Sequence, residues 1–329
     1  MRRKYLILFL PLGIILANIT AFFPELVEKI YAGGLYPFIG QGLSIATGFI
    51  PFSLGELIVV GGFLFFLISL IRLIQLLTQD KKRGKKRIKL YLLNVLTVIS
   101  IIYFVFVITW GLNYNRLPFF QIANYEVEPI SIEELALVCE DLIQRANTLR
   151  EQVEENELGV MKIPGDKPSA FKRASLGYEK AGQKYPQLGG NYGPPKGVLI
   201  SKVMAYAGIS GVYFPFTGEA NVNTLIPDSF LPATIAHEIA HQRGFAREDE
   251  ANYIAYLVGT LHPDIDFQYS GVFLALRHAM NTLGQHDYER FLGLRNNYSE
   301  GILRDLVELS SFWEKYDGLF EKISTEIND

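Results

Sequence analysis

Apolar positions are concentrated in the first third of the chain, in three long runs. The runs cover residues 5–23, 57–77 and 90–112, and Arg72 is the one charged residue within them. Each run is long enough to cross a hydrocarbon core of about 30 Å as a helix. The pattern therefore predicts an α-helical membrane anchor over residues 1–112, with about three transmembrane helices.

Two parts of this anchor have alternative interpretations. A cleaved signal peptide is the alternative for the first run, although Pro24 follows it where small residues would form a cleavage site. Residues 32–53 are rich in glycine and contain Pro37 and Pro51. We expect this segment to form a re-entrant or interfacial loop.

Basic residues give the anchor an orientation. Three of them, at positions 2–4, precede the first run, and residues 79–89 contain seven Lys or Arg against one acid. Such segments tend to stay in the cytoplasm, so three crossings would deliver the chain after Asn113 to the other side. We therefore expect a multi-pass protein of the bacterial cell membrane whose C-terminal domain, residues 113–329, is extracytoplasmic.

The C-terminal part begins after Trp110 and Tyr114, two aromatic residues that are expected to lie at the membrane interface. Over most of this part, apolar residues recur at the spacing of an α-helix. A capping box at residues 131–134 predicts a helix to about residue 155. Further helices are predicted over 169–184 and from 232 almost to the end, whereas residues 197–227 mix β-branched and aromatic residues with glycine. The predicted fold is an α-rich α+β domain with a small β-sheet.

Composition narrows the classes of function. Hydrophobic residues make up 49% of the chain and the net charge is −3, so nothing in the overall charge favours binding to nucleic acid. Cys139 is the one cysteine, which excludes an intrachain disulfide and a site built from several thiolates.

The motif HEIAH at residues 237–241 indicates a metal site. Side chains four residues apart on a helix lie on one face, so His237 and His241 can bind one cation. In this HExxH arrangement a zinc ion, Zn2+, lowers the pKa of a water molecule, and Glu238 takes and returns the proton. Two histidines that only form hydrogen bonds in the core are the alternative.

A catalytic zinc ion normally has a third protein ligand. Gly244 can end the motif helix and reverse the chain, after which Glu248 opens the next helix and can complete the metal site. Glu250 is the alternative ligand. Asn252, one turn after Glu248, is expected to form a hydrogen bond with a ligand histidine.

Other parts of a peptidase site are predicted from position alone. An edge strand before the motif helix would bind an extended peptide through its main chain. We assign this role to Glu219, Ala220, Asn221, Val222 and Asn223, with an ordinary hairpin strand as the alternative. His278 is the candidate for stabilising an oxyanion, whereas His262 and His286 are expected at the surface.

These residues carry a resemblance to known families. The run Glu248-x-x-Ala251-Asn252 after HExxH resembles the gluzincin pattern, in which such a glutamate is the third zinc ligand. The chain as a whole, with its apolar runs, YFPFTGEANVN and HEIAHQRGFAREDEAN, resembles a bacterial membrane family catalogued as domain of unknown function 3810. The resemblance implies a gluzincin-like metallopeptidase domain and supplies no substrate.

The expected function is that of a membrane-anchored zinc peptidase acting on a peptide or protein near the lipid bilayer. An intramembrane protease is disfavoured, because charged residues at positions 243 and 247–250 follow the motif closely and would be costly in hydrocarbon. A non-catalytic scaffold or assembly protein with a structural or vestigial zinc site is the alternative.

Overall fold

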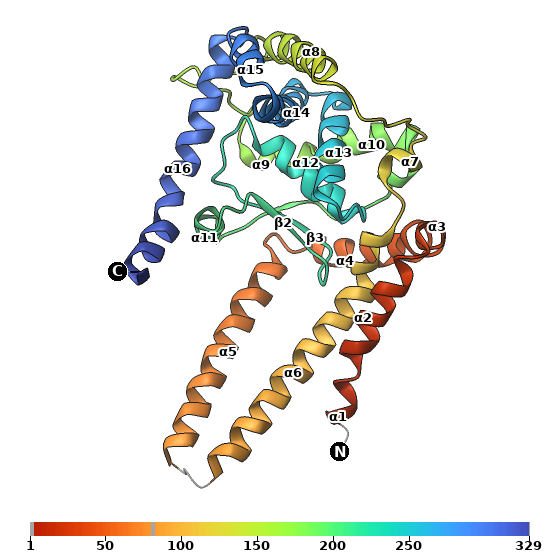
Figure 1. The fold of residues 1–329 in the computed structure, drawn as a ribbon, viewed down its shortest axis with the longest axis vertical. Coiled ribbons are helices and arrows are strands. Elements are labelled where there is room, and N and C mark those ends of the chain that lie inside the picture. Colours follow the sequence, from red (N-terminus) through yellow and green to blue (C-terminus); the bar gives the residue numbers. More distant parts are fainter. Residues whose placement is uncertain (1–2, 80–82, 329) are drawn as a thin grey trace.

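Two long helices, α5 (Leu54–Gln79) and α6 (Gly84–Thr109), extend from one side of the computed structural model, which describes residues 3–79 and 83–328 (Figure 1). Both are long and apolar enough to cross a membrane, and they overlap the predicted spans 57–77 and 90–112. None of the apolar window of α5 is buried against the residues that the structure describes. Part of the basic segment between them, residues 80–82, lies outside the described residues.

The first predicted span is less regular. It contains α1 (Arg3–Leu6) and α2 (Phe9–Thr20), and α2 packs along α6. After Thr20 the chain bends by 104° and continues through α3 (Pro24–Leu26), the π-helix η1 (Val27–Leu35) and α4 (Tyr36–Gly48). The described residues thus contain two clear spans, or three if this bent pair counts as one.

The segment expected to be a re-entrant or interfacial loop is helical over most of its length. Pro37 does not interrupt α4 because it occupies the first turn, where a backbone N–H has no partner within the helix. Figure 1 shows α3 and α4 between the long helices and the rest of the chain. There α4 contacts β3 (Glu219–Val222), which belongs to the C-terminal part.

The C-terminal part is mostly helical, as predicted. The capping box forms, with Ser131 and Glu134 bonded to each other's backbone, and the helix it opens ends at Arg150. Helices of this part are η3 (Gly111–Asn115), α7 (Phe119–Ile122), α8 (Ile132–Arg150), α9 (Lys167–Arg173), α10 (Ser175–Lys184), η4 (Pro186–Leu188), α11 (Ser201–Tyr206), α12 (Leu231–Gln242), α13 (Glu248–Leu261), α14 (Ile265–His286), α15 (Tyr288–Arg295) and α16 (Glu300–Asn328).

The motif helix α12 lies at the centre of this part. All of its residues except His237 are buried, because α13 and α14 cover it from one direction and the sheet from another. Apolar residues such as Ile235 and Ile239 join the main hydrophobic core. A helix buried on nearly every side is held rigidly, which suits side chains that must keep a fixed geometry.

The sheet has three short strands, β1 (Lys196–Gly197), β2 (Gly211–Phe214) and β3, in the order β1-β3-β2. The central strand β3 runs parallel to β1 and antiparallel to β2. All four residues of β3 are buried. Consequently β2 and β1 are the edges of this sheet.

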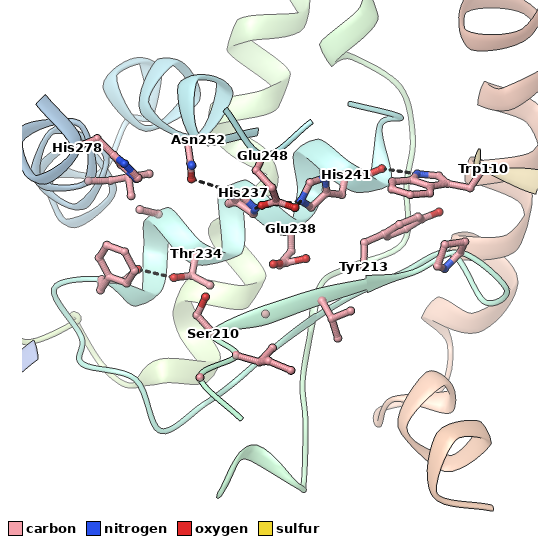
Figure 2. A pocket seen from close by; sticks show the side chains of 18 of the residues that line it. Trp110, Ser210, Tyr213, Thr234, His237, Glu238, His241, Glu248, Asn252 and His278 are labelled. Atoms are coloured by element: carbon pink, nitrogen blue, oxygen red, sulfur yellow. Dashed lines mark hydrogen bonds and ion pairs between the residues drawn. The ribbon is translucent and has the colours of Figure 1, made fainter. Parts of the chain in front are cut away.

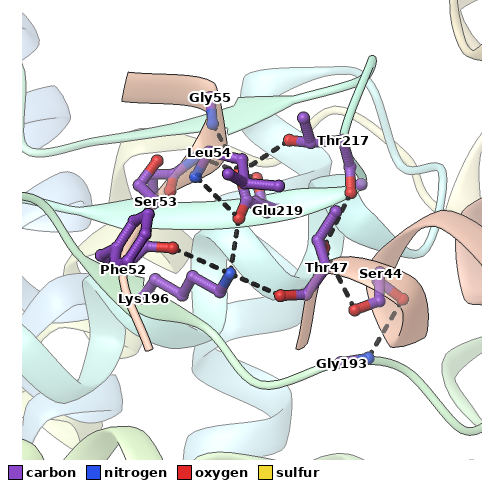
Figure 3. A network of polar contacts seen from close by, with 12 residues as sticks. Ser44, Thr47, Phe52, Ser53, Leu54, Gly55, Gly193, Lys196, Thr217 and Glu219 are labelled. Carbon is purple, nitrogen blue, oxygen red and sulfur yellow. Dashed lines mark hydrogen bonds and ion pairs between the residues drawn. The ribbon is translucent and has the colours of Figure 1, made fainter. Parts of the chain in front are cut away.

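A buried carboxylate joins the sheet to the start of α5 (Figure 3). Glu219 accepts hydrogen bonds from the backbone N–H groups of Leu54 and Gly55, at 3.1 and 2.7 Å, and pairs with Nζ of Lys196 at 2.6 Å. Lys196 also donates to the carbonyl oxygens of Thr47 and Phe52. The first turn of α5, the end of α4 and strand β3 are therefore held at one point.

Candidate metal centre

The two histidines of the motif converge on one point (Figure 2). Their Nε2 atoms lie 3.0 Å apart, on the same face of α12. Their Nδ1 atoms face oxygen acceptors instead: Oδ1 of Asn252 lies 2.9 Å from His237, and the carbonyl oxygen of Phe245 lies 2.7 Å from His241. Because Nδ1 donates in each case, both Nε2 lone pairs are available to a cation.

Glu248 completes the cluster. Its carboxylate oxygens lie 3.2 Å from Nε2 of His237 and 3.5 Å from Nε2 of His241. When the two imidazoles are protonated, their hydrogen bonds to Glu248 hold the pKa of this carboxyl well below its usual value. Among the described residues, these three are the group whose ligand atoms, all within 4.8 Å of one another, could hold a metal ion.

Glu250, the alternative ligand, is turned away from the histidines. One carboxylate oxygen accepts from the backbone N–H of Phe119 at 2.7 Å and from Arg247 at 3.1 Å. The geometry thus favours Glu248 over Glu250 as the third member of the site.

The turn that brings Glu248 to the histidines is fixed by side chains from earlier in the chain. Gly244 adopts a φ of 83°, which favours glycine, and reverses the direction of the chain. Carbonyl oxygens at the end of α12 are then bonded by Trp110 (to His241, 3.1 Å), Tyr36 (to Gln242, 2.8 Å) and Arg116 (to Gly244, 3.1 Å). These bonds satisfy helix-end carbonyls that would otherwise lack partners.

None of these three supports was predicted to contribute to the site. Trp110 was expected to be an interfacial anchor, yet it is buried against Tyr213 and His241. Its position directly after an apolar run was the available signal, and that signal fits both roles. Tyr36 and Arg116 are separated from the motif by too many residues for any local pattern to connect them.

Glu238 has an unusual environment for a carboxylate. It is 4% exposed, and its Oε2 atom has no hydrogen-bond partner in the described part of the chain. Burial raises the pKa of this carboxyl, although the neighbouring His237 and His241 act in the opposite direction. An unpartnered buried oxygen beside two imidazoles and a carboxylate fits a site that holds a metal ion and a water molecule.

A cavity of about 540 Å³ opens in front of this cluster. It is bounded by α12 and α13, by β2, and by the end of α6 that adjoins the domain (Figure 2). Gly211 brings β2 unusually close to the motif, since a Cβ atom there would lie 2.4 Å from Oε1 of Glu238. The cavity is therefore a cleft between the cluster of His237, His241 and Glu248 and the edge strand.

His278, on α14, lines the same cavity, and Figure 2 shows it beyond Asn252 as seen from His237. Burial, with a smaller contribution from Arg277, lowers the pKa of its imidazole and favours the neutral form. Its expected role in stabilising an oxyanion stays a prediction.

The prediction that Glu219, Ala220, Asn221, Val222 and Asn223 form an edge strand is wrong. Strand β3 lies between β1 and β2: β2 pairs with all four of its residues, and β1 pairs with Asn221 and Val222. Instead β2 is the edge strand beside the motif, and Gly211, Val212 and Tyr213 line the cavity. Sequence could not separate the two arms of the hairpin, because the choice depends on β1, which pairs with β3 from further back in the chain.

Comparison with known proteins gives a family and no activity. No curated protein and no solved structure matches the chain. One family, described as Protein of unknown function (DUF3810), matches residues 31–329, from η1 through the whole C-terminal part. The chain belongs to this family.

Proposed function

We propose that the chain is a membrane-anchored zinc peptidase whose metal is held by His237, His241 and Glu248. The observation that carries the proposal is the convergence of these three ligands with the unpartnered carboxylate oxygen of Glu238 on one cavity. Two imidazoles and one carboxylate form a donor set typical of catalytic zinc, which keeps a further position open.

The zinc ion and the residues of the chain would perform different parts of the reaction. When bound, zinc would act as a Lewis acid that polarises the scissile carbonyl and acidifies the attacking water. Glu238 accepts the proton from that water as its oxygen adds to the carbonyl carbon. The same glutamate then delivers the proton to the departing amine as the C–N bond breaks, so the reaction consumes one water molecule and regenerates the carboxylate.

Strand β2 is suited to hold the peptide. It is an edge of the sheet beside the motif, so an extended peptide can add to it through main-chain hydrogen bonds. Three of its residues already line the cavity. We infer that the scissile bond is aligned between β2 and the metal ligands.

The orientation of the site in the cell rests on the basic segment at residues 79–89, which favours a cytoplasmic position for the loop between α5 and α6. The C-terminal part would then lie on the extracytoplasmic side. A reporter fused after Asp329 that proved active only in the cytoplasm would contradict this orientation.

The test of the proposed function combines metal analysis with an unbiased assay. The full-length protein in detergent should contain about one zinc ion per chain, as expected for a site with three protein ligands. It should generate new peptide ends, read by mass spectrometry, in a mixture of synthetic peptides.

Single variants distinguish the residues that bind zinc from the residue that transfers the proton. Glu238→Gln should keep the zinc and abolish cleavage, His241→Ala and Glu248→Ala should lose both, and Glu250→Gln should keep the metal. Zinc without cleavage in the unaltered chain would favour the scaffold with a structural zinc site instead. A folded chain without zinc would overturn the proposal.

A further inference from the structure

Strand β2 lies directly at the end of α5 that adjoins the domain. The ring of Phe214, the last residue of β2, packs on Gly55, where a Cβ atom would lie 2.9 Å from the ring. The same turn of α5 is bonded to Glu219 of the neighbouring strand (Figure 3). From Leu57 onward the side chains of α5 are mostly exposed and apolar, so lipid begins within about one turn of this contact.

The same strand also adjoins α6. Tyr213, next to Phe214, contacts the ring of Trp110 with centroids 5.5 Å apart, and Trp110 directly follows the last residue of α6. Phe106, one turn earlier in α6, lines the cavity itself. Two consecutive residues of β2 are therefore fixed to the ends of two different membrane-spanning helices.

Helices α5 and α6 are closer to each other away from the domain than they are beside it. Ser69 and Tyr91 form a hydrogen bond of 3.1 Å between them, and Figure 1 shows the ribbons diverging from there toward the domain, with β2 and β3 above the wider end. Because none of the described residues covers the apolar window of α5, lipid or another apolar helix must lie beside it.

The domain continues this apolar surface beside the start of α5. Leu199 and Val203 are 80% and 61% exposed, and Val212 of β2 is also exposed. Glu56, in the first turn of α5, accepts hydrogen bonds from the backbone N–H groups of Leu199 and Ile200 at 2.9 and 2.7 Å. Leu199 is thereby held at the level where α5 enters the lipid, which gives its exposed side chain an apolar partner.

We propose that the substrate is the extended segment flanking a transmembrane helix of another membrane protein. This inference rests on the proposed function. The partner's helix lies in the lipid beside α5 and α6, and its flanking segment leaves the bilayer and pairs with β2. Since an extended chain advances only about 3.3 Å per residue and β2 lies within about one turn of the lipid, the scissile bond lies close to the helix end.

The experiment uses the full-length protein, loaded with zinc, in vesicles of phosphatidylethanolamine and phosphatidylglycerol. Its substrates share one randomised twelve-residue segment, presented either as a free peptide or after a transmembrane helix with a spacer of five or forty residues. We expect the short-spacer substrate to be cleaved at least tenfold faster than the long-spacer and free forms, with new ends close to the helix.

Surface variants provide a second readout. Leu199→Glu with Val203→Glu, which places charge against lipid outside the cavity, should lower cleavage of the short-spacer substrate about tenfold and leave the free peptide unchanged. Leu158→Glu is the matched control, because Leu158 is 78% exposed and lies in a turn between α8 and α9. It should change neither rate.

The possible outcomes distinguish a failure of this inference from a failure of the proposed function. Equal rates for anchored and free substrates would overturn the inference and leave the peptidase intact. Absence of cleavage in every form by a zinc-loaded wild-type chain would overturn both. An unchanged ratio of anchored to free cleavage in the double variant would also count against the proposed lipid contact.

Discussion

Asn252 accepts a hydrogen bond from Nδ1 of His237 across 2.9 Å, and this bond turns Nε2 of the same ring toward Glu248 and His241. An oxygen acceptor behind a ligand histidine fixes its tautomer and orientation, and removing one typically lowers metal affinity 10–100-fold. We expect a loss of this size in Asn252→Ala, measured by competition with a zinc chelator. Asn252→Asp keeps the acceptor and should bind zinc nearly as well as the unaltered chain. Equal affinity in the alanine variant would contradict this role.

Gly211 supplies a test of the distance between β2 and the proposed base. A Cβ atom there would lie 2.4 Å from Oε1 and 2.6 Å from Cγ of Glu238, so the buried glutamate must shift. Gly211→Ala should therefore lower peptidase activity at least tenfold, in proportion to the misplacement of the base, while the zinc content stays the same. Gly293→Ala is the control, since nothing lies within 4 Å of its added methyl group. Full activity in Gly211→Ala would show that Glu238 needs no fixed position.

The Glu219–Lys196 pair predicts a stability effect that is independent of catalysis. Both side chains are buried, and breaking such a pair from one side leaves an uncompensated charge that costs about 3–5 kcal/mol. Lys196→Met should destabilise the protein accordingly, as seen by thermal unfolding in detergent. Adding Glu219→Gln removes the orphaned charge and should restore most of the loss. A double variant no more stable than Lys196→Met would show that other contacts of Lys196 dominate.

Sequence predicted those features that depend on neighbouring residues. His237 and His241 come together because HEIAH lies in a single helix, and the chain reversal at Gly244 brings Glu248 to them. The long apolar runs of α5 and α6 were evident for the same reason. Each of these patterns lies within a few helical turns, where residue spacing determines which side chains share a face.

The features that the sequence did not predict depend on contacts between segments that are far apart in the chain. The identity of the edge strand was predicted wrongly because β1 pairs with β3 and not with β2. Tyr36 supports the end of α12 from 206 residues away, and no local periodicity predicts such a contact. Residues 32–53 were expected to form a re-entrant or interfacial loop; most of the segment is helical, and α4 contacts β3, which no local pattern predicts.

His262 was expected at the surface and is 2% exposed. Its ring accepts a hydrogen bond from the N–H of Asp264 at Nδ1 and donates from Nε2 to the carbonyl of Arg173, both at 3.0 Å. These two bonds require the neutral ring. Burial lowers the pKa of this imidazole below its unfolded value of about 6.5, so the unfolded chain binds a proton more readily than the folded one.

The stability that His262 contributes is consequently complete above pH 6.5 or so and is lost as the pH falls through the lowered pKa of the folded state. We expect the thermal midpoint in detergent to fall between pH 7.5 and 5 by a smaller amount in His262→Asn than in the unaltered chain, because asparagine can accept from Asp264 without titrating. The exposed His286 is the matched control, and His286→Asn should keep the full pH dependence. An unchanged slope in His262→Asn would show that other groups produce the loss of stability in acid.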